Sequence, residues 1–292
     1  MPSISIRNAR EFLAAVTARS LAAIEQAGIG AGQRELLVRT VLRYEPLTRQ
    51  NPLGNPLALI YLIAAAWRRP IDERALDLAC FVNLYLLAAD LIDDVQDEEL
   101  ARTPYAEAGP AIAVNSGLAL LFLALDCLRR SAPDGAGLGT RLALFNRISL
   151  RGVAGQHQDL LGERAARTPA EVLAMHEAKT CSLALIAECG ALVAGVDGPT
   201  RARYRRVGEA MARLVQVVDD LRDLFGKPFS PDLALGRPSY PVACLLDGAD
   251  EAATARWREV VARGDPGAVR ALLYDSGAVR RAAVALERLR RE

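Results

Sequence analysis

The stretch "YLLAADLIDDVQDEEL", from Tyr85 to Leu100, places several aspartates in an otherwise apolar helical pattern. At 100° per residue the aspartates share one arc of about 100°, while leucine, isoleucine and valine side chains fill the opposite arc. Like charges at this spacing repel one another, and apolar neighbours remove their hydration. The face is therefore either solvated or occupied by a cation. Its aspartates are Asp90, Asp93, Asp94 and Asp97.

Helical patterns extend over almost the whole chain. Alanine, leucine, arginine and glutamate dominate, and alternating β-branched runs are nearly absent. The breaks between patterns carry glycine and proline, as in "SAPDGAGLG" and "GVDGPT". No segment is typical of a linker, so we predict one all-α domain over residues 1–292. Apolar positions recur at helical spacing in 9–27, 34–44, 56–67, 72–96, 111–130, 138–161, 170–195, 200–225, 238–246, 251–262 and 267–290.

Composition argues against several classes of protein. A formal net charge of +1 and the lack of a dense basic block give no basis for binding nucleic acid or a membrane surface. The longest apolar run, Leu57 to Trp67, is about half of the ~20 residues that span a bilayer. The first residues lack the apolar core of a signal peptide. Five scattered cysteines without CxxC spacing predict reduced thiols. We expect a cytoplasmic protein with no nucleic-acid partner and no membrane span.

A second acidic cluster lies in "LVQVVDDLRDLFGK", where Asp219, Asp220 and Asp223 are predicted to share one helical face. Mg²⁺ takes one or two protein oxygens and completes its octahedron with water and phosphate. An acidic surface repels a phosphate, but the Mg²⁺ ions that it holds attract one. Two such clusters facing each other across a helical bundle would suit a diphosphate substrate.

Five motifs, in order along the chain, resemble those of the trans-isoprenyl diphosphate synthases, the polyprenyl synthetase family. Asp93–Asp97 resembles the first aspartate-rich motif, and "GQHQDL" at Gly155–Leu160 resembles the Gly-Gln-x-x-Asp-Leu motif. Lys179-Thr180 stands where the family has a Lys-Thr pair, and "QVVDDLRD" at 216–223 resembles the second aspartate-rich motif. The tail resembles the family at Lys227, Asp232 and "GRPSYP", with Arg237 where lysine is usual.

The resemblance implies a single large helical bundle of the isoprenoid synthase type with a central apolar cavity. It implies Mg²⁺, expected as three ions, bound by Asp93, Asp97 and Asp219. The ions would bind an allylic prenyl diphosphate, whose ionisation gives a carbocation inside a cavity that excludes water. The implied catalytic aspartates are Asp93, Asp94, Asp97, Asp219, Asp220 and Asp223. The implied substrate-binding residues are Arg102, Lys179, Thr180, Gln216, Lys227, Arg237, Gln156 and Asp159.

Four positions depart from the family pattern. A chain-elongating synthase binds isopentenyl diphosphate through a lysine, an arginine, a histidine or glutamine, and a second arginine. Losing several such contacts would weaken binding by several orders of magnitude. Alternatively the alignment is shifted, and Arg43 or the Arg68-Arg69 pair takes their place. The replacing residues are Asn55, Ala58, Leu86 and Thr103.

These departures predict a terpene synthase on a prenyl-synthase scaffold, acting on a C15–C20 allylic diphosphate. One alternative is a prenyltransferase, either to a non-isopentenyl acceptor or as an ordinary chain-elongating synthase. Another is a non-catalytic partner subunit, although both aspartate motifs are intact. The family resemblance also implies a homodimer.

Small residues before the first motif bear on substrate length. Ala88 and Ala89 predict a deep cavity, unless Tyr85 or Phe81 closes its floor. Each of the remaining polar residues has two possible roles. Asp90 is a further metal-shell ligand or a solvated carboxylate, and Gln156 and Asp159 line the site or hold structure. His157 and His176 are expected at the surface or in packing.

Overall fold

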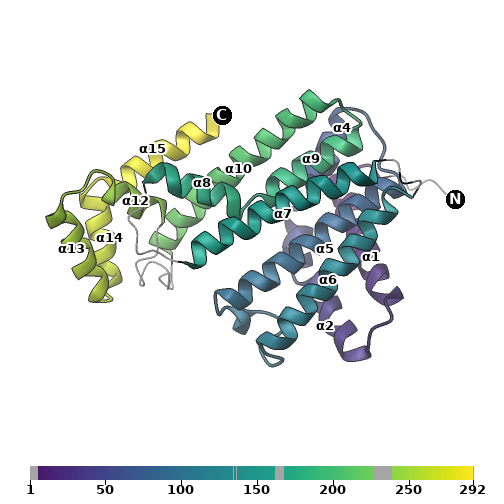
Figure 1. Ribbon diagram of the computed structural model, residues 1–292, viewed down its shortest axis with the longest axis horizontal. Helices are drawn as coiled ribbons and strands as arrows, with labels where there is room; N and C mark the ends of the chain where they lie inside the picture. Colours follow the sequence, from purple (N-terminus) through teal and green to yellow (C-terminus); the bar gives the residue numbers. More distant parts are fainter. Residues whose placement is uncertain (1–5, 134, 136, 162–167, 227–238, 292) are drawn as a thin grey trace. The chain divides into compact units, whose positions relative to one another are not determined.

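The computed structural model describes residues 6–133, 135, 137–161, 168–226 and 239–291 (Figure 1). All regular secondary structure within these ranges is helical, with no strand among them. The all-α prediction is confirmed.

The chain divides into two compact units. The first comprises residues 1–147 and 185–205, and the second 148–184 and 206–292. The prediction of a single domain over 1–292 stays a prediction.

Helices of the first unit include α1, α2, α5 and α6, which lie side by side in Figure 1. Its elements are α1 (Ala9–Gln26), α2 (Ala31–Leu42), α3 (Glu45–Gln50), η1 (Pro52–Gly54), α4 (Ala58–Ala66), α5 (Glu73–Gln96), η2 (Leu100–Arg102) and α6 (Pro110–Arg130). Parts of three helices shared with the second unit complete it, namely α7 (Leu138–Leu160), α9 (Ser182–Ala194) and α10 (Gly198–Phe225). The second unit adds α8 (Pro169–Lys179), α12 (Tyr240–Leu246), α13 (Glu251–Ala262), α14 (Pro266–Asp275) and α15 (Ala278–Arg291).

Local sequence sets where several helices begin. The Asp72 side chain accepts a hydrogen bond from the backbone N–H of Ala75 and so caps α5. Thr168 and Glu171 form a reciprocal capping box at the start of α8. These caps satisfy N–H groups that the first helical turn leaves without partners.

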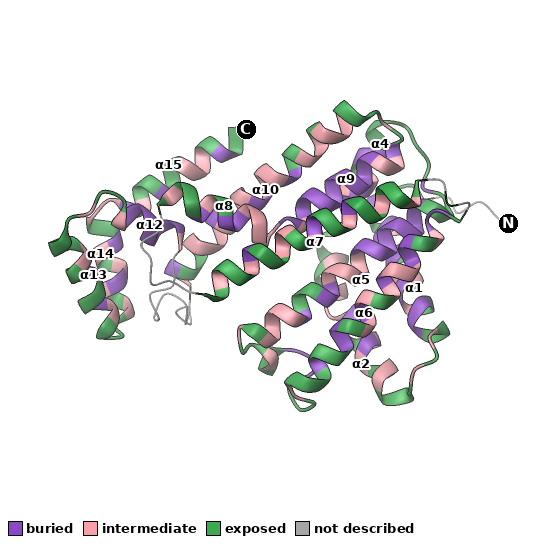
Figure 2. Ribbon diagram, in the orientation of Figure 1, coloured by how far each residue is buried: buried purple, intermediate pink, exposed green. Residues whose placement is uncertain are grey.

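Helix α5 forms much of the core of the first unit, as its purple stretch in Figure 2 shows. Gly117 on α6 permits close approach, because a Cβ there would lie 3.0 Å from Cδ1 of Ile92 on α5. The nearly buried carboxylate of Asp77 lies 3.1 Å from a guanidinium nitrogen of Arg19 and 3.5 Å from one of Arg130. α5 and α6 are both long and apolar enough to cross a membrane. However, two-thirds of the most apolar window of α5 is buried among other helices, as expected of a core helix.

The second unit has its own apolar core. Val172 and Met175 on α8 belong to the same buried cluster as Val217 on α10 and Trp257 on α13. Within this unit, glycine lets α10 pack closely against the start of α9. A Cβ on Gly208 of α10 would lie 2.5 Å from the carbonyl oxygen of Leu183.

We predict that Gly208→Ala destabilises the protein by more than about 2 kcal/mol, since its methyl group would meet backbone atoms that cannot move aside. Gly139→Ala is the matched control, because a Cβ on this glycine of α7 meets nothing within 4 Å. That change should stabilise by up to about 1 kcal/mol. Urea unfolding of both variants measures the difference. Equal midpoints would contradict the packing described.

Candidate functional site

The first aspartate cluster lies at the C-terminal end of α5. Asp93 and Asp94 occupy its last turn, and Asp97 is the C-cap residue. The helix dipole places partial negative charge there, and no basic residue lies in that turn. Loss of hydration of the carboxyl group, followed by the charges of Asp93 and Asp94, raises the pKa of Asp90 to about 7, although Arg43 opposes this shift and the residue retains an exposed surface. A bound cation would relieve this concentration of negative charge.

The turn that follows the motif holds a non-glycine residue in the left-handed region. Glu98 has a φ of 59°, a conformation that glycine adopts most easily. Two backbone hydrogen bonds, from Glu98 N to Val95 O and from Glu99 N to Asp94 O, close a Schellman motif around it. The end of α5 is therefore fixed in position at the expense of local strain.

Asp94 forms an ion pair within the first unit. Its Oδ2 lies 2.6 Å from Nη1 of Arg43, and the Arg43 guanidinium lies 5.2 Å from the centre of the Tyr44 ring. The predicted ligands of the motif remain Asp93 and Asp97.

A buried hydrogen-bond network fixes the segment beyond the motif. The Thr103 hydroxyl donates to Leu100 O and accepts from Tyr105 N–H. The ring of Tyr105 is fully buried, and its hydroxyl lies 3.0 Å from Oγ1 of Thr40 on α2. This network positions η2, whose Arg102 is exposed to solvent.

In the second unit, Lys179 and Asp159 form an ion pair. Nζ of Lys179 lies 2.7 Å from Oδ2 of Asp159, so two residues predicted for the site are in contact. Gly155 makes this contact possible, because a Cβ there would collide with backbone atoms of Ala178 and Lys179. Thr180, the C-cap residue of α8, follows directly. Gln156 and Gln216 are both half-buried.

The three aspartates of the second cluster lie in different environments. Their predicted position on one helical face did not indicate this difference. Asp223 is exposed, and the Asp219 carboxylate lies 3.1 Å from Nη1 of Arg222. Asp220 instead accepts a 2.6 Å hydrogen bond from the N–H of Tyr240, the first residue of α12. Burial raises the pKa of Asp220 to about 7, although the Tyr240 N–H opposes this shift.

His176 is a contact of this cluster that sequence reasoning did not identify. The residue is buried, as one of its two expected readings allowed, and its Nε2 lies 3.5 Å from Oδ2 of Asp220. Burial lowers the pKa of His176 to about 4, so the imidazole is neutral near pH 7. The sequence feature that could have indicated this contact is the position of His176 on α8, one turn before Lys179.

The donor set suits a metal that takes few protein ligands. Across the described ranges, no three acidic, histidine or cysteine side chains are grouped closely enough to hold an ion by themselves. Each cluster nevertheless offers carboxylate oxygens with solvent access, which fits Mg²⁺ completed by water and phosphate. The predicted residues Lys227, Asp232 and Arg237 lie outside the described residues.

Comparison with known proteins now decides the family. The polyprenyl synthetase family model matches residues 56–274. The chain belongs to this family. Its fold is the all-α isoprenoid synthase fold. A decaprenyl diphosphate synthase from Rhodobacter capsulatus superimposes with a TM-score of 0.80 at 21% identity, covering 96% of this chain and 87% of that one. A polyprenyl synthetase from Streptomyces coelicolor A3(2) gives 0.77 at 23% identity, covering 95% and 89%.

Curated relatives extend the family likeness. The chain is 27% identical to farnesyl diphosphate synthase of Geobacillus stearothermophilus, over 68% of this chain and 72% of that protein. It is 30% identical to geranylgeranyl diphosphate synthase of Mycobacterium tuberculosis, over 68% and 59%. It is also 28% identical to tryptophan prenyltransferase ComQ of Bacillus subtilis subsp. natto, over 51% and 44%.

The positions that depart from the family pattern have local structural roles. Nδ2 of Asn55 donates to the Thr48 hydroxyl, and its Oδ1 accepts from Leu57 N–H. Ala58 is buried at the start of α4, and the Thr103 hydroxyl is engaged in its own turn.

Two of the three basic residues considered as substitutes have side-chain partners. Arg43 pairs with Asp94, and Nε of Arg69 donates to the carbonyl of Ala194. Arg68 is exposed, with a φ of 53°.

We predict that Glu98→Gly stabilises the protein by about 1 kcal/mol, because glycine adopts the left-handed conformation without a Cβ clash. Glu99→Gly removes the same charge one residue later, at a φ of −96°, and should not stabilise. Thermal unfolding of the two variants separates charge from conformation. Equal shifts would show that charge alone is responsible.

Proposed function

We propose that this protein is a Mg²⁺-dependent prenyltransferase that ionises an allylic prenyl diphosphate and passes the prenyl cation to an acceptor lacking a diphosphate. The observation that carries this proposal is the contrast between two sets of positions. Both aspartate motifs, Arg102 and Lys179 are retained. Asn55, Ala58 and Thr103 are neutral. The polar side chains of Asn55 and Thr103 already have local partners, and Ala58 is buried.

The residues proposed for the reaction have separate tasks. Asp93, Asp97 and Asp219 would hold Mg²⁺, proposed as three ions, which supplies positive charge to the departing diphosphate. Lys179 would bind a diphosphate oxygen, and its contact with Asp159 orients the ammonium group beforehand. Arg102 would add a second cation from the exposed turn after the motif. Gln156, Thr180, Gln216, Lys227 and Arg237 remain proposed substrate contacts.

The chemical class of the acceptor follows from the charge at the four positions that depart from the family pattern. A diphosphate acceptor needs cations that Asn55, Ala58, Leu86 and Thr103 do not supply. The relative named as a tryptophan prenyltransferase supports an uncharged aromatic acceptor. Cyclisation of the substrate's own chain, as in a terpene synthase, is the second candidate, because the same neutral surface also suits a folded hydrocarbon. Chain elongation and a non-catalytic subunit remain alternatives, and the intact aspartates argue against the latter.

An aromatic cluster is proposed as the floor of the prenyl cavity. Phe81 and Tyr85 stack on α5 with ring centres 6.2 Å apart, and Phe145 on α7 meets both edge-on at 5.6 and 5.4 Å. Ala89 is exposed one helical turn beyond Tyr85, on the face that leads to Asp93.

Of the two alanines predicted to give a deep cavity, Ala88 also lies at a helix–helix contact. This residue is buried, and its carbonyl oxygen would lie 3.5 Å from a Cβ on Gly117 of α6, so the close packing of α5 and α6 is a second reason for a small residue here.

Exposed apolar residues on α6 support the expected homodimer. Leu118 and Phe122 lie one turn apart and are 47% and 67% exposed. We propose that α6 contributes to the contact between copies.

Removal of the metal tests the proposed chemistry. We expect EDTA, Asp93→Ala and Asp219→Ala each to reduce diphosphate release from farnesyl or geranylgeranyl diphosphate by at least a thousandfold. Glu99→Ala, close to the motif but not in it, is the control and should retain activity. Near-normal turnover of Asp93→Ala would refute the metal assignment.

The preferred length of the prenyl substrate should change when the proposed floor of the cavity is altered. Tyr85→Ala and Phe145→Ala remove rings from the proposed end of the cavity, and we expect the preference to shift toward a longer allylic diphosphate by about tenfold in kcat/KM. Tyr274→Ala, which removes an exposed ring on α14, should leave the preference unchanged. Competition between C15 and C20 substrates gives the ratio. An unchanged ratio in both floor variants would place the floor elsewhere.

A further inference from the structure

Arg43 is a basic residue in direct contact with the first aspartate motif. It is the C-cap residue of α2, and its Nη1 lies 2.6 Å from Oδ2 of Asp94 on α5. The two side chains are only 25% and 16% exposed, so solvent screens this pair less than a pair at the surface. Within the described part of the chain, neither residue forms a second ion pair.

The end of α2 is fixed in position on two sides. The Arg43 guanidinium lies 5.2 Å from the centre of the Tyr44 ring, within the range of a cation–π interaction. In the last turn of α2, Oγ1 of Thr40 lies 3.0 Å from the hydroxyl of Tyr105, in the segment that follows the motif. Arg43 is therefore held beside Asp94 independently of a bound metal.

This contact affects which carboxylates a metal at the motif can use. Mg²⁺ needs only one or two protein oxygens and completes its shell with water and phosphate. A metal that took Asp94 as a ligand would have to displace the guanidinium and leave a half-buried charge without its partner. Arg43 stays protonated at any working pH, and its charge also acts on Asp90, one turn earlier on α5. The same charge repels a divalent cation nearby.

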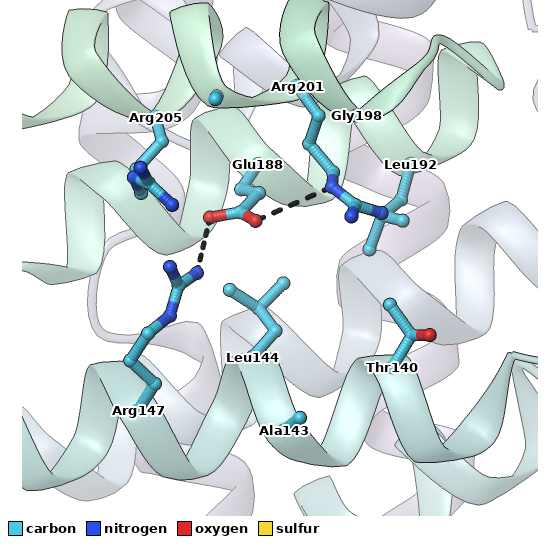
Figure 3. Close-up of a pocket in the computed structure, with 10 residues that line it drawn as sticks. Thr140, Ala143, Leu144, Arg147, Glu188, Leu192, Gly198, Arg201 and Arg205 are labelled. Atoms are coloured by element: carbon cyan, nitrogen blue, oxygen red, sulfur yellow. Dashed lines mark hydrogen bonds and ion pairs between the residues drawn. The ribbon is translucent and has the colours of Figure 1, made fainter.

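An ion pair elsewhere in the first unit provides a reference. Figure 3 shows a pocket lined by Arg147 of α7, Glu188 of α9 and Arg201 of α10. Oε2 of Glu188 lies 2.7 Å from Nη2 of Arg147, and the described lining residues include none from either aspartate motif. Breaking this pair would also remove one positive charge and leave a carboxylate with fewer partners. It would do so at a place that contains none of the proposed metal ligands.

We propose that Arg43 is a positioning residue of the metal site. It withholds Asp94 from the metal and lowers the affinity of the substrate-free protein for divalent cations. This inference rests on the proposed function only in taking the first motif as a Mg²⁺ site, and not on the reaction or the acceptor.

The test measures binding of Mn²⁺, which prefers the same oxygen ligands as Mg²⁺, to the full-length protein without substrate. Electron paramagnetic resonance counts the free Mn²⁺, so no turnover is needed. Arg43→Gln should bind Mn²⁺ about tenfold more tightly than the wild type, because it removes a repelling charge and frees Asp94. In an Asp94→Asn background the same change should give a clearly smaller gain, since no carboxylate is then freed.

Three further variants assign the effect. Arg43→Lys keeps a cation beside Asp94 and should bind Mn²⁺ nearly as weakly as the wild type. Arg147→Gln breaks the reference pair with Glu188 and should also bind as the wild type does. Adding Asp93→Ala to Arg43→Gln should abolish the tightened binding, which places the gain at the first motif.

Unchanged or weaker Mn²⁺ binding by Arg43→Gln would overturn the proposal, as would a lack of saturable Mn²⁺ binding in every variant. An equal gain with and without Asp94 would also overturn it, because Arg43 would then withhold no ligand. Failure of the proposed function has a different signature, since diphosphate release and product formation do not enter these measurements.

Discussion

Mutual repulsion of the carboxylates at the end of α5 is the constraint on which the proposed chemistry depends. The helix ends in aspartates where its dipole is already negative, with no basic residue in the last turn. Loss of hydration and the neighbouring charges of Asp93 and Asp94 raise the pKa of Asp90 to about 7. Such an arrangement is stable when a cation is present, and Mg²⁺ with few protein ligands fits the available oxygens. We propose that a diphosphate binds at this end of α5 through Mg²⁺, which would supply the positive charge that the aspartates require.

The surrounding structure fixes these groups in position. A strained left-handed Glu98 and the Thr103–Tyr105–Thr40 network hold the chain beyond α5. In the second unit, Gly155 lets α7 approach α8 closely enough for Asp159 to hold Lys179. The groups proposed to meet the diphosphate are therefore oriented before the substrate arrives, which is the condition for electrostatic stabilisation of a leaving group.

The sequence predicted the helices and the two acidic motifs because periodicity and spacing are local properties. It also paired Asp159 and Lys179 in one site through the family resemblance. It did not predict that Asp220 would accept from Tyr240 N–H, that His176 would face Asp220, or that Ala88 would pack on α6. Each of these depends on which side of a helix meets a neighbour distant in the chain. The pocket that Arg147 of α7 lines together with Arg201 of α10 was not predicted either, because these residues lie far apart in the sequence.

We propose that the protein retains the allylic diphosphate site of its family and has lost the isopentenyl diphosphate site. Incubation of the wild-type protein with Mg²⁺, farnesyl diphosphate and radiolabelled isopentenyl diphosphate tests it most directly, with a chain-elongating family member as positive control. We expect diphosphate release from the allylic substrate when the acceptor is supplied or the chain cyclises, and no label in any longer prenyl diphosphate. Label incorporated at a rate comparable to that of the positive control would contradict the account and identify an ordinary chain-elongating synthase.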